Sequence, residues 1–240
     1  MDGLFGKQRG YLDRIRKEDV AVESIGSILR SLSALPQEAW MKYAFSREPL
    51  NGRFTDAERI ALGEKADACG RFYASELTRA FASEDIDTIV SCLHLQVECP
   101  EIPQHADRVL FAEFREPDRI NIFMDGIRKC SPFLEDPAVR DVLGDTDIRK
   151  LLLGHEIFHF VEEKHKAEIF THTYRHTLWT LGPLKNRSEI AVLSEIAAMG
   201  FTRELNHLSF SPYLMDAFLI YGYSPEAASQ LCREMLQFSK

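Results

Sequence analysis

Apolar residues recur every three or four positions over the first part of the chain, which is the spacing of an amphipathic helix. The pattern runs from residue 11 to residue 35 and is interrupted by Pro36, so the sequence predicts a helix over residues 11–35. Residues 48–55 (EPLNGRFT) are rich in turn formers and predict a linker. A second helix is expected from Thr55 to Phe81, because Thr55 is followed by two acidic residues in the first turn.

The middle of the chain has the character of short strands. Residues 85–103 (DIDTIVSCLHLQVECPEIP) form a short apolar segment closed by prolines. Residues 108–114 (RVLFAEF) and 119–123 (RINIF) are β-like, and the residues between them include Pro117. This spacing suits a β-hairpin.

From Asp145 onward the pattern is typical of helices at nearly every position. Either Asp145 or Thr146 is a plausible N-cap for a helix that carries the segment LLLGHEIFHFVEE. Further helices are expected over Ser188–Leu205, Tyr213–Tyr221 and Pro225–Phe238.

These elements predict an α+β fold that is mostly helical, with a small β-sheet packed on the helix that contains HEIFH. The turn-rich segment suggests a division of the chain into two parts. We expect an N-terminal helical segment over residues 1–54, and a main domain with a C-terminal helical extension over residues 55–240.

The composition is that of an ordinary globular protein, with 45% hydrophobic and 28% charged residues. A formal net charge of −8 disfavours nucleic acid as a partner, because phosphate contacts need clustered Lys and Arg. No apolar run approaches the roughly 20 residues that cross a bilayer, and no signal peptide is visible, so no membrane is expected. The five cysteines are scattered without a C-x-x-C pair, which fits a cytoplasmic protein.

The segment His155-Glu156-Ile157-Phe158-His159 predicts a metal site. Residues four apart on a helix lie one above the other, so the imidazoles of His155 and His159 can point to one position, as two ligands of a Zn²⁺ ion must. Glu156 can then reach a water that the metal activates and accept its proton. Because the flanking residues are apolar, this helix is expected to be buried, and a metal would offset the desolvation of its polar side chains. Two hydrogen-bonded core histidines are the alternative.

Three residues are candidates for the third metal ligand. His165 has the overall spacing of the metzincin proteases, but Glu162 stands where those have a glycine, and on a continuing helix His165 points away. Glu195 is favoured, because it lies among helically spaced apolar residues where a carboxylate would be buried, although an exposed glutamate is the simpler alternative. Glu189 is the reserve candidate.

The chain resembles the ImmA/IrrE-type metallopeptidases, a gluzincin-like group with a zincin-like core. The resemblance rests on the segment DIDTIVSCLHLQV and the paired strands, on the helix LLLGHEIFHFVEE, and on a later E-x-x-A-x-x-F-x-x-x-L pattern that begins at Glu195. It spans roughly residues 70–206, and Phe158 departs from the glycine usual before the second histidine. It implies one Zn²⁺ per chain held by His155, His159 and Glu195, with Glu156 as the catalytic base and a peptide or protein as substrate.

Two other functions fit parts of the sequence. A ferritin-like di-iron protein would use E-x-x-H pairs, which occur here as Glu156/His159, Glu162/His165 and Glu204/His207. A zincin fold that binds or senses without catalysis is the other. Residues that could donate a hydrogen bond to a developing oxyanion are His172, Tyr174, Arg175 and His176, and more weakly His207 and Tyr213.

Overall fold

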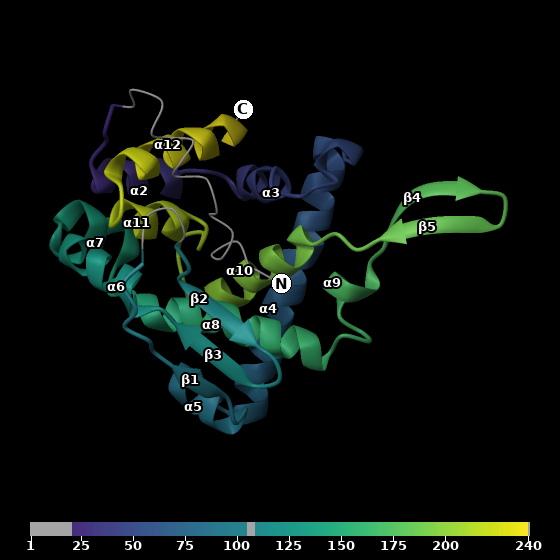
Figure 1. The fold of residues 1–240 in the computed structure, drawn as a ribbon, viewed down its shortest axis with the longest axis horizontal. Coiled ribbons are helices and arrows are strands. Elements are labelled where there is room, and N and C mark those ends of the chain that lie inside the picture. The colour runs from purple at the N-terminus through teal and green to yellow at the C-terminus, as the bar shows by residue number, and fades with distance from the viewer. Residues whose placement is uncertain (1–20, 105–108, 240) are drawn as a thin grey trace.

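The computed structural model describes residues 21–104 and 109–239 (Figure 1). The α+β, mostly helical fold class is confirmed. The helices are α2 (Ile25–Ser33), α3 (Gln37–Phe45), α4 (Asp56–Phe81), α5 (Ile86–Cys92), α6 (Met124–Cys130), α7 (Pro137–Leu143), α8 (Ile148–Lys164), α9 (Phe170–Thr173), α10 (Val192–Leu205), α11 (Leu214–Tyr221) and α12 (Pro225–Leu236). Short 3-10 turns cover Asn51–Arg53, Ser131–Glu135 and Gln237–Ser239. The strands are β1 (Gln96–Glu98), β2 (Ala112–Arg115), β3 (Arg119–Ile122), β4 (His176–Leu181) and β5 (Leu184–Ser188).

A three-stranded sheet lies against α8 through β2 and β3 (Figure 1). Its order is β1-β3-β2, with β1 parallel and β2 antiparallel to the central strand β3. The predicted hairpin over residues 108–123 is therefore confirmed, except that Arg108 lies outside the described residues. Because β2 is at the end of this order, one of its edges is not paired within this sheet.

Helix α8 is the buried centre of the fold. Most of its residues, from Ile148 to Glu162, are buried, and it contacts α4, α5 and α10 as well as the sheet. Its N-cap is Asp147, whose side chain accepts a hydrogen bond from the Lys150 backbone. The expectation of Asp145 or Thr146 as the cap was wrong, because the acceptor must directly precede the first helical residue to reach the free N–H groups of the first turn.

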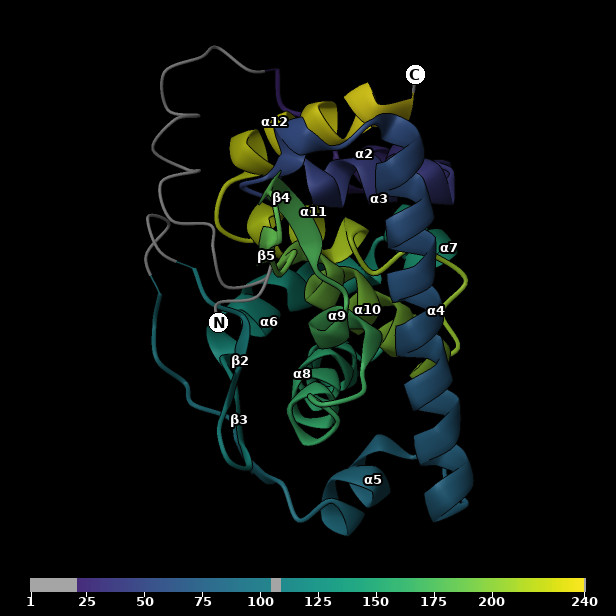
Figure 2. The same ribbon diagram turned by 90° about the vertical axis from the view of Figure 1, so that its right-hand side faces the viewer.

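Helix α4 packs along α10, and Figure 2 shows it running down one side of the molecule. Thr55 and Glu58 form a capping box at its start, so the helix predicted over Thr55–Phe81 is confirmed. Two glycines, Gly70 in α4 and Gly200 in α10, allow these two helices to approach each other closely. A Cβ on Gly70 would overlap with the carbonyl oxygen of Ala197, and one on Gly200 would lie 2.6 Å from that of Asp67. The backbone of α10 is therefore set directly against the backbone of α4.

The N-terminal helices share one hydrophobic core with the rest of the chain. Helix α2 contacts α7, α11 and α12, so segments from both ends of the sequence lie side by side. The boundary expected after residue 54 falls at a turn between α3 and α4, where the buried Glu48 carboxylate accepts a hydrogen bond from the Val192 backbone. Among the described residues, no helix is long and apolar enough to cross a membrane.

Two predicted helices differ from the structure. The helix predicted over residues 11–35 begins only at Ile25 in the part described, because Ser24 has an extended backbone and caps it; residues 11–20 lie outside the described residues. The helix expected over Ser188–Leu205 begins only at Val192, and the residues before it, 176–188, form the β4–β5 hairpin although the pattern after Asp145 is typical of helices. Its turn contains Gly182 at φ +57°, followed by Pro183, and neither residue suits the interior of a helix.

We expect Gly70→Ala to lower the free energy of unfolding by about 1–3 kcal/mol, because the added methyl group must push α4 and α10 apart. Gly52→Ala is the matched control, since a Cβ there would meet nothing within 4 Å, and it should change stability by less than about 0.5 kcal/mol. Urea denaturation followed by circular dichroism measures both. Equal effects from the two variants would contradict a close helix crossing.

Candidate metal centre

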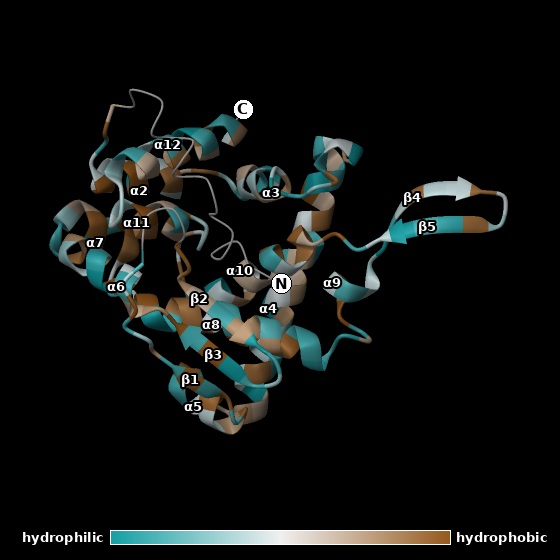
Figure 3. Cartoon of the chain, in the orientation of Figure 1, coloured by the Kyte–Doolittle hydropathy of each residue, from teal (hydrophilic) through white to brown (hydrophobic). Residues whose placement is uncertain are grey.

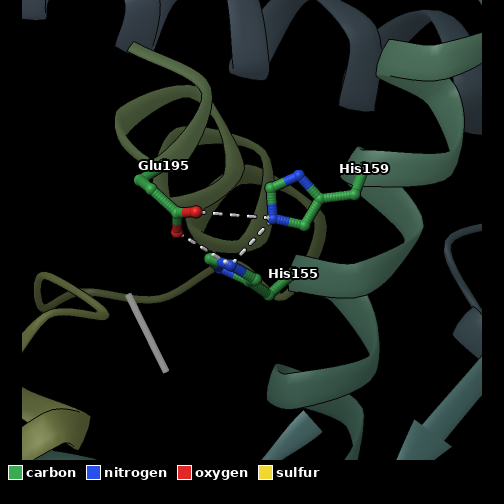
Figure 4. A group of neighbouring side chains, drawn as sticks. All are labelled: His155, His159 and Glu195. Atoms are coloured by element: carbon green, nitrogen blue, oxygen red, sulfur yellow. Dashed lines mark hydrogen bonds and ion pairs between the residues drawn. The ribbon is translucent and has the colours of Figure 1, made fainter. Parts of the chain in front are cut away.

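Two imidazoles and one carboxylate face one another between α8 and α10 (Figure 4). The Nε2 atoms of His155 and His159 lie 3.2 Å apart, as their four-residue spacing on α8 allows. Glu195, in the first turn of α10, places Oε2 3.4 Å from His155 Nε2 and Oε1 4.0 Å from His159 Nε2. The group is well shielded, with His155 fully buried and 14% of the Glu195 side chain exposed.

The separation of these atoms fits a shared metal ion. Two nitrogens bound to one tetrahedral ion at the usual Zn–N distance of about 2.0–2.1 Å lie about 3.3 Å apart. The observed 3.2 Å between the two Nε2 atoms is close to that value. The side chains of His155, His159 and Glu195 could therefore hold a metal ion through two nitrogens and one oxygen.

Glu162 is a further part of this centre that the sequence did not identify as such. Its Oε2 lies 3.3 Å from His159 Nδ1 and accepts a hydrogen bond of 2.6 Å from Ser194 Oγ, while Thr171 donates to its other oxygen. A carboxylate on the far nitrogen of a histidine fixes the ring and directs the lone pair of Nε2 to the metal position. The signal was present in the sequence, since an acidic residue three positions after His159 lies on the same helix face.

The negative charges around His159 counteract the effect of burial on its pKa. Burial alone lowers the pKa of His159, but the hydrogen bond to Glu162 and the negative charges of Glu195 and Glu156 raise it to about 9. Burial likewise favours the protonated form of Glu162, yet its hydrogen bonds with His159, Ser194 and Thr171 lower its pKa below the usual value. The local field therefore favours a cation between these carboxylates, whether a proton or a metal ion.

Glu156 is set apart from the three candidate ligands. It is 4% exposed, and burial raises the pKa of its carboxyl group, while the two histidines and a hydrogen bond from the Phe114 backbone act in the opposite direction. The Phe114 contact holds the carboxylate of Glu156 against strand β2. A buried carboxylate with a raised pKa, next to a candidate metal position, is suited to accept a proton.

A cleft of about 380 Å³ opens between β2 and α8. Strand β2 and the adjoining residues form one wall, and Glu156, His159 and Glu162 belong to the other. His172 also lines this cleft, with its Nε2 3.8 Å from Glu162 Oε1. The candidate base and one candidate ligand thus border a space large enough for several atoms of a bound molecule.

The other two candidates for the third ligand lie elsewhere. His165 ends α8 and pairs with Glu168 at 2.7 Å, and 42% of its side chain is exposed. Glu189 follows β5, is half exposed and forms an ion pair of 2.6 Å with Arg175. Neither belongs to the His155–His159–Glu195 group.

Of the residues considered as oxyanion donors, His172 lines the cleft. The imidazole of His176 packs against the ring of Phe54, and His207 is 69% exposed and pairs with Glu84. Tyr213 is buried with its ring stacked on Trp40. Tyr174 packs against Phe170, and Arg175 pairs with Glu189 as described above.

Comparison of the chain with protein-family models, with curated proteins and with solved structures found no match. The chemistry of the centre therefore follows from its own residues.

We expect Glu162→Gln to weaken the binding of a divalent metal ion at this centre by about 10–100-fold, because the neutral amide no longer stabilises and orients His159 as the carboxylate does. Glu163→Gln, one residue further along α8 and paired with Lys166, is the control and should leave the metal affinity unchanged. Competition with a chromophoric chelator measures both affinities. The same affinity in both variants would rule out an orienting role for Glu162.

Proposed function

We propose that this protein is a zinc-dependent peptidase. The observation that carries the proposal is the convergence of His155, His159 and Glu195 beside the separate carboxylate of Glu156, at the side of a cleft. Two imidazoles and one carboxylate form a donor set found in catalytic zinc sites, which keep a fourth position for water. A zinc ion bound there would supply a Lewis acid and a water that ionises near neutral pH.

In this proposal Glu156 moves the proton. Its carboxylate accepts a proton from the attacking water and passes it to the nitrogen of the leaving amine. The backbone N–H of Phe114 holds the carboxylate in place through a hydrogen bond. His172, which lines the same cleft, is the donor best placed to meet negative charge on the substrate carbonyl oxygen.

Strand β2 offers a template for an extended peptide. Phe111 accepts a hydrogen bond from the Phe123 backbone, so in the alternating antiparallel pattern Glu113 and Arg115 also bond to β3. Ala112 and Phe114 then direct their backbone groups away from β3, as the contact between Phe114 and Glu156 indicates. Ala112 lines the cleft, where its backbone groups can pair with a peptide added at the edge of the sheet.

The end of this edge is closed by a side chain. The carboxamide of Gln104 both accepts from the Leu110 backbone N–H and donates to the Leu110 carbonyl oxygen. Leu110 is the next residue beyond Ala112 whose backbone groups point away from β3, and both of these groups are already bonded to Gln104. A peptide on this edge would be limited to the region of Ala112 and Phe114, next to Glu156.

The peptidase proposal also draws on the order of elements on which the resemblance to ImmA/IrrE-type metallopeptidases rests. A short helix and strand, α5 and β1, precede the β2–β3 hairpin, the helix with both histidines and the helix with Glu195. The di-iron alternative receives no such support. Of its E-x-x-H pairs, His165 and His207 bond to exposed glutamates away from the centre.

We expect Glu156→Gln to lower peptide hydrolysis by about 10²–10⁴-fold while one zinc per chain is retained, because the amide cannot accept the proton. Turnover is measured on a mixture of internally quenched peptides, and metal content by elemental analysis. Glu168→Gln, on an exposed residue beyond the cleft, is the control with unchanged turnover. If the wild type binds zinc but cleaves no peptide, the chain is a binding module instead; if it binds two irons, the zinc centre is wrong.

The charge of the cleft predicts a preference for cationic peptides. Five glutamates line it, at positions 113, 116, 156, 162 and 163, against the single arginine Arg115. We expect peptides with Lys or Arg near the cleaved bond to have a kcat/KM about 3–10-fold above that of acidic peptides at low salt. The double variant Glu116→Gln/Glu163→Gln should reduce this ratio, and added salt should do the same in the wild type. A ratio that neither change affects would count against electrostatic selection.

A further inference from the structure

The β4–β5 hairpin projects from the body of the protein (Figure 1). Its base is attached through Arg53, which donates to the Leu178 carbonyl oxygen, and through the packing of Phe54 on His176. Its far end carries large apolar side chains that are strongly exposed, and Figure 3 shows hydrophobic colour there. Leu181 is 70%, Leu184 62% and Trp179 50% exposed. Apolar side chains grouped in this way mark a surface that binds something.

The register of the hairpin arranges these residues in a fixed order from its tip. Leu181 is paired with Leu184 across the Gly182-Pro183 turn, and both side chains point to the same face. Trp179 lies two residues further from the tip, so its side chain is on that face as well. The exposed leucines are therefore outermost, and the indole is about 7 Å behind them.

Positive charge accompanies the apolar end of the hairpin. Lys185 is paired with Thr180, between the leucines and Trp179, and Arg187 is paired with Thr177, behind Trp179. Within the described residues neither of them forms an ion pair. Residues 175–188 contain no Asp or Glu, although the whole chain has a net charge of −8. This region is therefore a cationic projection on an acidic protein, and it is complementary to an anionic surface.

The size of the apolar end argues against a stable protein interface. Such interfaces bury about 800 Å² and some 20–30 residues on each partner, whereas three side chains make up this face. A lipid bilayer requires less, because it needs no matching groove. Leucine side chains enter the acyl boundary, tryptophan is favoured at the interface, and Lys and Arg attract anionic headgroups. The leucines lie at the tip of the hairpin, and Trp179 and the two cations lie behind them, at the level of the interface and the headgroups.

We propose that the β4–β5 hairpin binds anionic membrane surfaces by inserting Leu181, Leu184 and Trp179 while Lys185 and Arg187 contact lipid phosphates. The insertion is shallow, since unpaired backbone groups cannot enter the hydrocarbon layer. The earlier expectation of no membrane partner rested on the absence of a spanning segment, and a surface contact does not need one. This proposal is independent of peptidase activity.

The test is sedimentation of the full chain with phosphatidylcholine vesicles, with and without about one third phosphatidylglycerol. We expect binding to the anionic vesicles, reduced about tenfold or more by Leu181→Ser/Leu184→Ser and about tenfold by Lys185→Gln/Arg187→Gln. Fluorescence reports insertion directly, because Trp40 is buried and a blue shift on vesicles must come from the exposed Trp179. High salt should weaken binding of the wild type.

The matched controls are Phe72→Ser and Ile102→Ser, which remove equally exposed apolar side chains outside the hairpin and should leave binding unchanged. Three results would overturn the proposal. The first is a wild type that sediments with neither kind of vesicle, and the second is binding of the hairpin variants equal to that of the wild type. The third is a dimer in solution that Leu181→Ser/Leu184→Ser converts to a monomer, which would assign the apolar face to a second copy of the chain.

Discussion

Burying two imidazoles and three carboxylates around α8 is the constraint on which the fold around the centre depends. Each of these groups loses hydration, and contacts with neighbouring polar groups offset part of that loss. Glu162 is the clearest case, because its two oxygens accept from Thr171 and Ser194 while it also contacts His159. The surrounding apolar residues of α8 and α10 limit the access of water and so strengthen these polar contacts.

The rigidity of this arrangement comes from backbone packing. Helix α10 carries Glu195 and Ser194, and its glycine-lined contact with α4 leaves little freedom for it to slide. Helix α8 is enclosed by the sheet on one side and by α10 on another. The two candidate histidines and the carboxylate that faces them are therefore held by elements whose relative position is set by backbone packing, as a preorganised site requires.

The segment between α8 and α10 contributes to two different parts of the structure. Its first part returns to the centre, where Thr171 bonds to Glu162 and His172 lines the cleft. Its second part leaves the core as the β4–β5 hairpin with an exposed apolar end. In the proposed functions, one stretch of chain thus connects a hydrolytic site with a membrane contact, and a bilayer would hold the cleft near molecules that gather at its surface.

The sequence by itself determined what depends on neighbours a few residues away. Such short-range patterns predict the four-residue spacing of His155 and His159, the capping box at Thr55 and the hairpin over β2 and β3, and the structure has each of them.

Tertiary structure decided what those patterns leave open. It brings Glu195 rather than Glu189 or His165 to the two histidines, because the packing of α10 on α4 and α8 sets which face of that helix turns inward. It also assigns Glu162 its role through Thr171 and Ser194, nine and 32 residues away in the chain. Helical spacing shows which residues share a face, but only the packed core shows what that face meets.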